Sequence, residues 1–147
     1  MAQFSVTSTK RLNSCDPRLV ALFQEVVRTY DCTVLCGHRG QAEQDDAFRR
    51  GASKKKWPTG EHNALPSRAA DVAPYDARAP GGVNWGVDPV TGKPSREAIA
   101  RFYFFAGFVK ARALALGIKI RFGGDWDDDT FFDDQTFNDL VHYELID

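Results

Sequence analysis

The amino-acid sequence predicts a single α+β domain, residues 1–147, in which a small and mostly antiparallel sheet packs with about three helices. Three observations favour this fold class. Helical patterns occupy three segments, short β-type runs separate them, and strand and helix show little regular alternation. A length of 147 residues with 43% hydrophobic and 27% charged residues suits one globular domain.

The N-terminal half contains two predicted helices with a strand between them. Asp16-Pro17 supplies an N-cap and a first-turn proline for a helix over 18–30, which carries apolar residues on one stripe. A β-type run over 33–36 follows, and then a polar helix over 41–50; each of these ends at a glycine. Residues 52–67, rich in Lys, Pro, Gly and Asn, predict a loop.

The C-terminal half contributes one long helix and three short strands. Residues 68–73 predict a strand, and the Gly- and Pro-rich stretch 75–94 predicts a loop. The longest helix is expected over 95–116, where apolar residues recur every three or four positions. Alternation over 118–122 predicts another strand, and a terminal strand is expected at 141–146.

The three cysteines predict free thiols. Their number is odd, and a chain of this length does not need disulfides to stabilise a core. On a regular strand Cys32, Val34 and Cys36 share one face, so we interpret these thiols as buried apolar groups and not as metal ligands.

The charge balance and the hydropathy exclude two classes of partner. Nineteen basic and twenty acidic residues give a net charge of -1, which argues against a nucleic-acid binder held by bulk electrostatics. No apolar run approaches the roughly 18 residues of a membrane span, and the first residues do not resemble a signal peptide. We therefore expect a monomer made in the cytoplasm, without integral membrane association.

Two histidines and two aspartates form the strongest candidate for a catalytic centre. His62 precedes Asp71 by nine residues, and Asp139 precedes His142 by three. A catalytic zinc ion commonly takes three such ligands and keeps a fourth position for water, whose pKa it lowers toward ~7, while a free carboxylate accepts the proton. The alternative is a solvated His62 and a hydrogen-bonded His142. Asp71 resists that interpretation because a charge in an apolar strand is costly unless paired.

The residues around these side chains resemble a known family. The matching blocks are Gly37-His38-Arg39, His62-Asn63-x-x-Pro66-Ser67-x-Ala69-x-Asp71-Val72-Ala73-Pro74-Tyr75, Arg121-Phe122-Gly123-Gly124-Asp125-Trp126 and Asp139-x-x-His142-x-Glu144. Together they resemble phage and bacterial L-alanyl-D-glutamate endopeptidases, which are related to D-alanyl-D-alanine carboxypeptidases and dipeptidases. The blocks run in the expected order from about residue 30 to the C-terminus.

The resemblance implies a site and a fold. It implies zinc held by His62, Asp71 and His142, with Asp139 as general base and Arg39 binding substrate or stabilising the oxyanion. It also implies the fold of D-Ala-D-Ala peptidases and hedgehog domains, with the zinc site in a groove on the sheet. A surface arginine after a tight glycine turn is the alternative for Arg39, although a guanidinium suits an oxyanion because it is always charged.

The chain departs from many relatives at two points. Nine residues separate His62 from Asp71 where seven are usual, and Asp139 stands where the dipeptidase branch has Glu. The longer gap resembles a phage-type variant with an insertion that the loop absorbs. The shorter base argues against a dipeptidase.

Two further residues are candidates for supporting roles. Glu144 alternates onto the strand face of His142 and could orient that ligand or contact substrate, with a simple salt bridge as the alternative. Ser67 lies between two ligands in sequence and could bond to Asp71 or to substrate, with an ordinary turn serine as the alternative. We assign His38 a structural role.

An acidic segment over 125–134 raises the hypothesis of a second cation, Ca²⁺. Asp125, Asp127 and Asp129 have the spacing of the first three ligands of a calcium loop. The pattern then fails, because Thr130 replaces the turn glycine and Thr136 replaces the bidentate glutamate. A solvated acidic loop is the alternative.

The sequence thus predicts a zinc-dependent peptidoglycan hydrolase of the endolysin type that cuts the stem peptide, with the L-Ala–D-Glu bond implied by the resemblance. The alternatives are a D-alanyl-D-alanine carboxypeptidase and a catalytically silent metal-binding relative. We expect no separate cell-wall-binding domain, and we expect the enzyme to reach the wall through a membrane lesion made by another protein.

Overall fold

Four helices, four strands and two short 3-10 turns make up the fold in a computed structural model of residues 1–147. The helices are α1 (Val6–Leu12), α2 (Pro17–Val27), α3 (Gln41–Arg49) and α4 (Arg96–Ala115), the strands are β1 (Cys32–Cys36), β2 (Ala69–Pro74), β3 (Ile120–Phe122) and β4 (His142–Leu145), and the 3-10 turns are η1 (Glu61–Asn63) and η2 (Pro80–Gly82).

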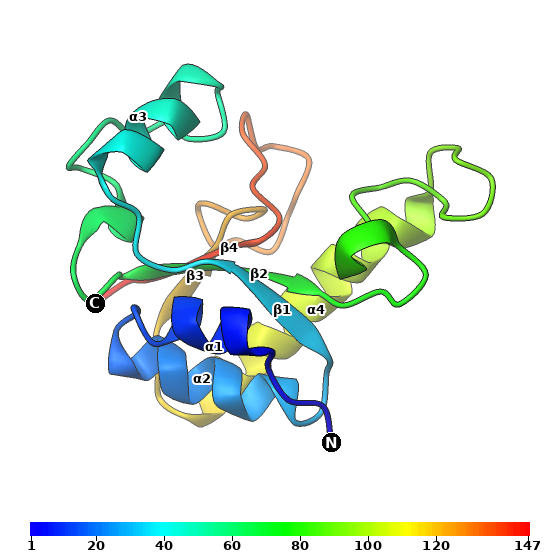
Figure 1. The fold of residues 1–147 in the computed structure, drawn as a ribbon, viewed down its shortest axis with the longest axis horizontal. Helices are drawn as coiled ribbons and strands as arrows, with labels where there is room; N and C mark the ends of the chain where they lie inside the picture. The colour runs from blue at the N-terminus through cyan, green and yellow to red at the C-terminus, as the bar shows by residue number, and fades with distance from the viewer.

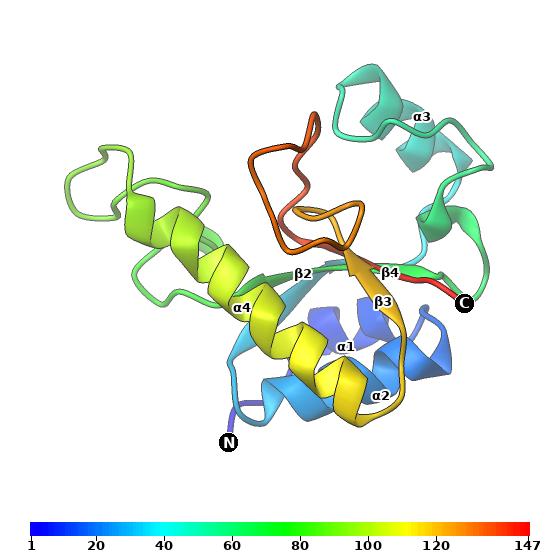
Figure 2. The ribbon, with the colours of Figure 1, turned by 180° about the vertical axis from the view of Figure 1, so that it is seen from behind.

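The strands form one antiparallel sheet in the order β1-β2-β4-β3. Helices α1, α2 and α4 cover one face of this sheet (Figure 1). Helix α3 and the long connections lie on the opposite side, as the reverse view also shows (Figure 2). The predicted α+β class is confirmed, and the sheet separates an apolar helical layer from a more polar one.

The apolar layer is built around Tyr143, which is fully buried. Its ring packs against Phe23 and Phe122, each with a centroid 5.5 Å away, and against Phe105 at 6.2 Å. These rings come from α2, β3 and α4, so one side chain of β4 ties three elements together. Burial on this scale is the main stabilising term for the sheet.

The register of the sheet places polar residues side by side on its other face. Asp71 of β2 pairs with Cys36 of β1 on one side and with His142 of β4 on the other. Neighbouring residues in a row of a sheet point to the same face. The row Cys36–Asp71–His142 therefore faces away from the helical core.

The prediction that Cys36 shares a face with Cys32 and Val34 is wrong. The pairing of β1 with β2 is irregular between Val34 and Cys36, since Val34 opposes Val72 but Cys36 opposes Asp71. The extra residue, Leu35, forms a β-bulge, which reverses the alternation of side chains beyond it. Cys32 and Val34 stay in the core, whereas Cys36 turns to the polar face.

Helix α1 was not predicted, and several boundaries differ from the prediction. Only Ser8 and Leu12 of α1 are buried, so the segment has almost no apolar periodicity, and its capping bond from Ser8 N to Ser5 Oγ (3.1 Å) is a local signal. Helix α2 ends at Val27, short of residue 30, and strands β3 and β4 are shorter than expected. Helices α3 and α4 and strand β2 lie where the sequence places them.

The four helices differ from a membrane-spanning segment. None of them combines the length and the apolar composition that a membrane-spanning segment needs.

We expect Tyr143→Phe to stabilise the fold. The Tyr143 hydroxyl is buried without a hydrogen-bond partner, and burial raises the pKa of this phenol well above its ordinary value. Removing an unsatisfied hydroxyl should raise the free energy of unfolding by about 1 kcal/mol. Thermal unfolding followed by circular dichroism should show a rise in Tm of about 2–4 °C. Tyr75→Phe, at an exposed position, is the matched control and should change nothing. A lower Tm for Tyr143→Phe would contradict this account.

Candidate active site

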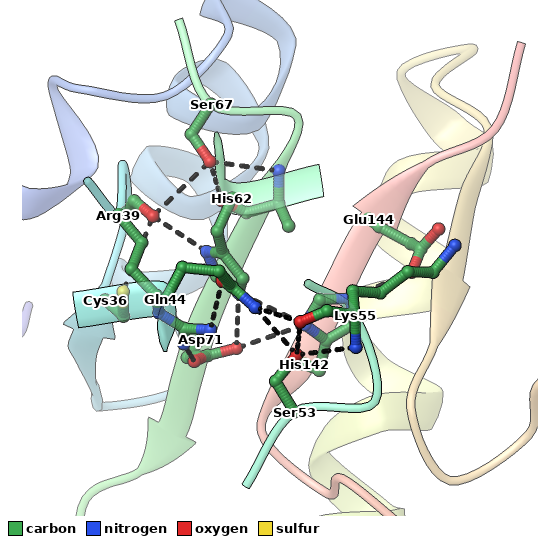
Figure 3. Close-up of polar contacts among 12 residues, drawn as sticks. Cys36, Arg39, Gln44, Ser53, Lys55, His62, Ser67, Asp71, His142 and Glu144 are labelled. Atoms are coloured by element: carbon green, nitrogen blue, oxygen red, sulfur yellow. Dashed lines mark hydrogen bonds and ion pairs between the residues drawn. The ribbon is translucent and has the colours of Figure 1, made fainter. Parts of the chain in front are cut away.

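Three side chains from distant parts of the chain converge above the centre of the sheet (Figure 3). The Nε2 atom of His62 lies 3.1 Å from Oδ1 of Asp71 and 3.2 Å from Nδ1 of His142. The third side of this triangle, from His142 Nδ1 to Asp71 Oδ1, is 3.3 Å. All three residues are buried. The structure thus brings together the three residues that the sequence predicts as metal ligands.

Each of the two imidazoles has a second ring nitrogen that points away from the cluster, the outer nitrogen. A hydrogen-bond partner fixes the position of the proton on this nitrogen. His62 Nδ1 lies 2.7 Å from the carbonyl oxygen of Gly37, and His142 Nε2 lies 2.9 Å from Oε1 of Glu144. Carbonyl and carboxylate oxygens only accept hydrogen bonds, so both outer nitrogens donate. In the neutral rings, the inner nitrogens therefore present lone pairs toward each other and toward Asp71.

This cluster has acceptors and no donor of its own, which suits a cation. Ligand atoms bound at 2.0–2.1 Å around a tetrahedral zinc ion lie about 3.3–3.4 Å from one another. The three measured separations, 3.1, 3.2 and 3.3 Å, agree with that spacing. Two imidazoles and a carboxylate are also a common donor set for such an ion. The residues present therefore fit a metal ion, with a fourth position left toward the pocket.

The electrostatics of the cluster favour positive charge. Burial opposes protonation of both histidines, yet the Asp71 carboxylate outweighs it and raises the pKa of His62 to about 10 and that of His142 to about 9. Although burial works against its charge, Asp71 has a pKa well below the ordinary value because both histidines hold the carboxylate ionised. Two protons do not fit between nitrogens 3.2 Å apart, so one cation is the better occupant.

Asp139 lies beside this triangle without being hydrogen-bonded to it. One of its carboxylate oxygens is within 4.8 Å of the ligand atoms of Asp71 and His142, and the side chain lines the pocket. Burial and the negative charge of Asp71 raise the pKa of Asp139 above its ordinary value. A carboxylate with a raised pKa and free oxygens can exchange protons with a group bound at the cluster.

Arg39 reaches the same cluster from the segment between β1 and α3. Its Nη2 lies 3.4 Å from Oδ2 of Asp71, and its Nη1 donates to Oε1 of Gln44 at 3.1 Å. The guanidinium is thus held at two ends and faces the pocket. Its position favours a role in contacting substrate over the alternative of an ordinary surface arginine.

Gln44 is a buried polar side chain of this region that the sequence analysis did not single out. On α3 it is only 1% exposed. Its Oε1 accepts from Arg39 and, at 3.1 Å, from Asn63; its Nε2 donates to Ser53 Oγ at 3.0 Å and to the Lys55 carbonyl at 2.7 Å. All four hydrogen-bonding positions of the amide are satisfied. Gln44 therefore joins Arg39 to both ends of the loop that precedes η1.

Glu144 contacts His142 and Arg121. Although burial disfavours its charge, hydrogen bonds from His142 and from Arg121 Nη2 (2.9 Å) lower the pKa of Glu144 to about 2. An ionised Glu144 orients the His142 ring.

Ser67 Oγ does not contact Asp71. It lies 2.7 Å from the Ala69 carbonyl and 3.4 Å from the Gly37 carbonyl, the same oxygen that His62 contacts.

Cys36 is a potential metal ligand that the sequence led us to exclude. Its sulfur lies within 4.8 Å of the ligand atoms of both His62 and Asp71, a consequence of the bulge at Leu35. His38, by contrast, contacts the Ala64 carbonyl through Nδ1 at 3.0 Å and lies outside the cluster, in keeping with a structural role.

The acidic segment forms a separate cluster. Carboxylate oxygens of Asp125, Asp127 and Asp129 lie within 4.8 Å of one another. However, both oxygens of Asp125 already accept backbone N–H groups, from Asp129 and Thr130 at 3.1 Å each. This arrangement is that of a self-capped loop, and the calcium hypothesis stays a prediction.

A pocket opens over the cluster between two walls. One wall is formed by α3 and the segment 52–62, and the other by the segment that carries Trp126, Phe137 and Asp139. The pocket volume is ≈ 250 Å³, several times the roughly 30 Å³ that one water occupies, so it has room for part of a ligand. The centroids of the Trp126 and His142 rings are 5.4 Å apart, and Trp126 lines the pocket.

Comparison with known proteins identifies a family and a similar fold. Residues 1–146 match the family model described as phage L-alanyl-D-glutamate peptidase. The chain is similar to the L-alanyl-D-glutamate peptidase of Escherichia phage T5, with 26% identity over 149 residues that cover 98% of each chain. Its fold is similar to the crystal structure of the Serratia marcescens L-Ala D-Glu endopeptidase ChiX. The TM-score is 0.68 and the identity 24%, over 98% of this chain and 90% of the other.

We expect Gln44→Ala to destabilise the protein strongly. The substitution leaves the buried partners of the amide without their bonds and creates a cavity, so the free energy of unfolding should fall by about 2–4 kcal/mol. Urea unfolding measures this change. Gln41→Ala, at an exposed position of the same helix, is the control and should stay within about 0.5 kcal/mol of the unsubstituted protein. Equal effects of the two substitutions would show that the Gln44 network does not hold the site together.

Proposed function

The chain belongs to the family of phage L-alanyl-D-glutamate peptidases, and we propose that it is a zinc-dependent hydrolase that cuts the stem peptide of peptidoglycan between L-alanine and D-glutamate. Residues 1–147 would act as one catalytic domain on the cell wall. The observation that carries the proposal is the convergence of His62, Asp71 and His142 on one point, with the unbonded carboxylate of Asp139 next to it.

Zinc is the metal that this donor set supports best. Zinc favours tetrahedral sites with imidazole and carboxylate ligands, and such an ion lowers the pKa of water and polarises a carbonyl. His62 Nε2, Asp71 Oδ1 and His142 Nδ1 would hold the ion. Gly37 and Glu144, through the outer nitrogens, keep both rings in the required tautomer.

Asp139 would act as the proton carrier of the reaction. Its carboxylate accepts the proton of the attacking water and returns it to the amine of D-glutamate as the peptide bond breaks. The raised pKa of Asp139 suits both steps, because a stronger base takes the proton more readily at neutral pH. The shorter side chain, where related dipeptidases have Glu, needs no change of mechanism.

Arg39 would stabilise the oxyanion that develops on the scissile carbonyl. Its guanidinium faces the pocket and is fixed by Asp71 and Gln44, so it does not have to reorganise during the reaction.

The first test concerns the metal. We expect His142→Ala to lose bound zinc, because only two of the three ligands remain, and we expect a chelator to abolish the lysis of cell-wall material until zinc is added back. Mass spectrometry measures the metal content, and zymography measures the lysis of cell-wall material. His38→Ala is the matched control, since this ring lies outside the cluster. Full zinc occupancy in His142→Ala would refute the proposed ligand set.

The second test concerns the reaction. Purified peptidoglycan digested with the zinc-loaded protein should yield new amino termini on D-glutamate, identified by mass spectrometry. Asp139→Asn should reduce kcat by about 100-fold or more while zinc stays bound, because the proton carrier is lost. Asp133→Asn, exposed in the same segment, should keep full activity.

The outcomes separate the alternatives. Release of terminal D-alanine without new termini on D-glutamate would identify a carboxypeptidase. Unchanged function in Asp139→Asn with zinc retained would identify a protein that uses its metal for binding or stability only.

A further inference from the structure

Two lysines on the rim of the pocket have no charged partner. Lys54 and Lys55 both line the pocket, and neither forms an ion pair with any carboxylate of the chain. Three other charged groups of the pocket are paired, Arg39 with Asp71, Glu61 with Arg68, and Glu144 with Arg121, whereas Asp139 forms no ion pair. Two unpaired ammonium groups therefore stand beside the cluster.

The chain fixes the segment that carries these lysines. The Lys55 carbonyl accepts from the buried Gln44 amide at 2.7 Å, and the Lys55 backbone N–H donates to Ser53 Oγ at 3.1 Å. Figure 3 shows the Lys55 side chain extending away from Gln44. The Lys54 ammonium lies 5.1 Å from the centre of the Phe137 ring, on the opposite wall of the pocket. Anchoring of this kind lowers the entropic cost of binding a ligand.

The proposed substrate carries a negative charge near the scissile bond. A D-glutamate residue has two carboxyl groups besides the amino group that the scissile bond uses. The onward chain consumes at most one of them, so the other remains a free carboxylate unless it is amidated. It lies only a few bonds from the scissile nitrogen, so in a bound peptide it would come close to the pocket residues around the cluster.

We propose that Lys54 and Lys55 form a subsite for this free carboxylate and make the enzyme selective against peptides in which it is a carboxamide. The inference rests on the proposed function. Arg39 is not the carboxylate receptor in this assignment, because its guanidinium, held in place by Asp71 and Gln44, is assigned to the oxyanion. The two lysines also offset the negative charge of Asp139, which would otherwise repel an anionic peptide.

The experiment compares two peptides that differ in one group. One contains L-Ala–D-Glu with the free carboxylate, and the other carries a carboxamide in its place. With zinc-loaded protein, we expect kcat/KM to favour the carboxylate by about three- to fivefold, mainly through KM, as for ion pairs with exposed lysines. In the double variant Lys54→Met/Lys55→Met this preference should fall toward one. The salt dependence of KM for the carboxylate peptide should fall with it.

Lys56→Met is the matched control. Lys56 belongs to the same segment, but its ammonium lies over the Phe48 ring at 5.2 Å and does not line the pocket. This variant should keep the full preference for the carboxylate. The subsite proposal alone would be overturned if the double variant kept that preference. It would also be overturned if the unsubstituted enzyme cut both peptides equally. Failure of the unsubstituted enzyme to cut either peptide would overturn the proposed function and the subsite with it.

Discussion

The site depends on one electrostatic constraint, the meeting of three acceptor atoms with no side-chain donor between them. Two imidazole lone pairs and a carboxylate oxygen within 3.1–3.3 Å of one another repel unless a positive charge lies between them. Tyr143, next to His142 on β4, packs into the aromatic core on the other face. Packing of that core therefore stabilises a register that the polar face, by itself, would oppose.

A second layer of hydrogen bonds makes the cluster specific. The Gly37 carbonyl and Glu144 fix the histidine protons, and Gln44 holds the guanidinium that balances Asp71. Two glycines permit the close approaches that this layer needs. A Cβ at Gly37 would collide with the backbone of Arg11, and one at Gly123 would collide with the Asp139 carbonyl. The segments on either side of the cluster thus pack closely against backbone, which restricts the movement of the cluster's side chains.

The sequence predicted the parts of this arrangement that depend on local pattern. Asp71 stood out because a charge inside an apolar strand needs a partner, and α4 followed from its periodicity. The bulge at Leu35 was not predictable, since it arises from the pairing of β1 with β2, and so Cys36 was assigned to the wrong face. Gln44 was missed because, on a polar helix, nothing in the sequence distinguishes a glutamine buried by the loop that follows the helix from one in solvent.

The nine-residue gap between His62 and Asp71 illustrates how the spacing of two site residues in sequence can differ from their fixed positions in the fold. Each end is fixed independently. The His62 ring is held by the Gly37 carbonyl, and the His62 carbonyl accepts a hydrogen bond from the Arg39 backbone N–H at 2.8 Å. Asp71 is fixed by the pairing of β2 with β1 and β4. The chain between them is held at Ser67, whose backbone exchanges bonds with Ser14 and Asp16 (2.9 and 2.8 Å). The remaining length is taken up outward, where Leu65 is 75% exposed. Additional residues therefore lengthen a surface loop and leave the ligand atoms in place.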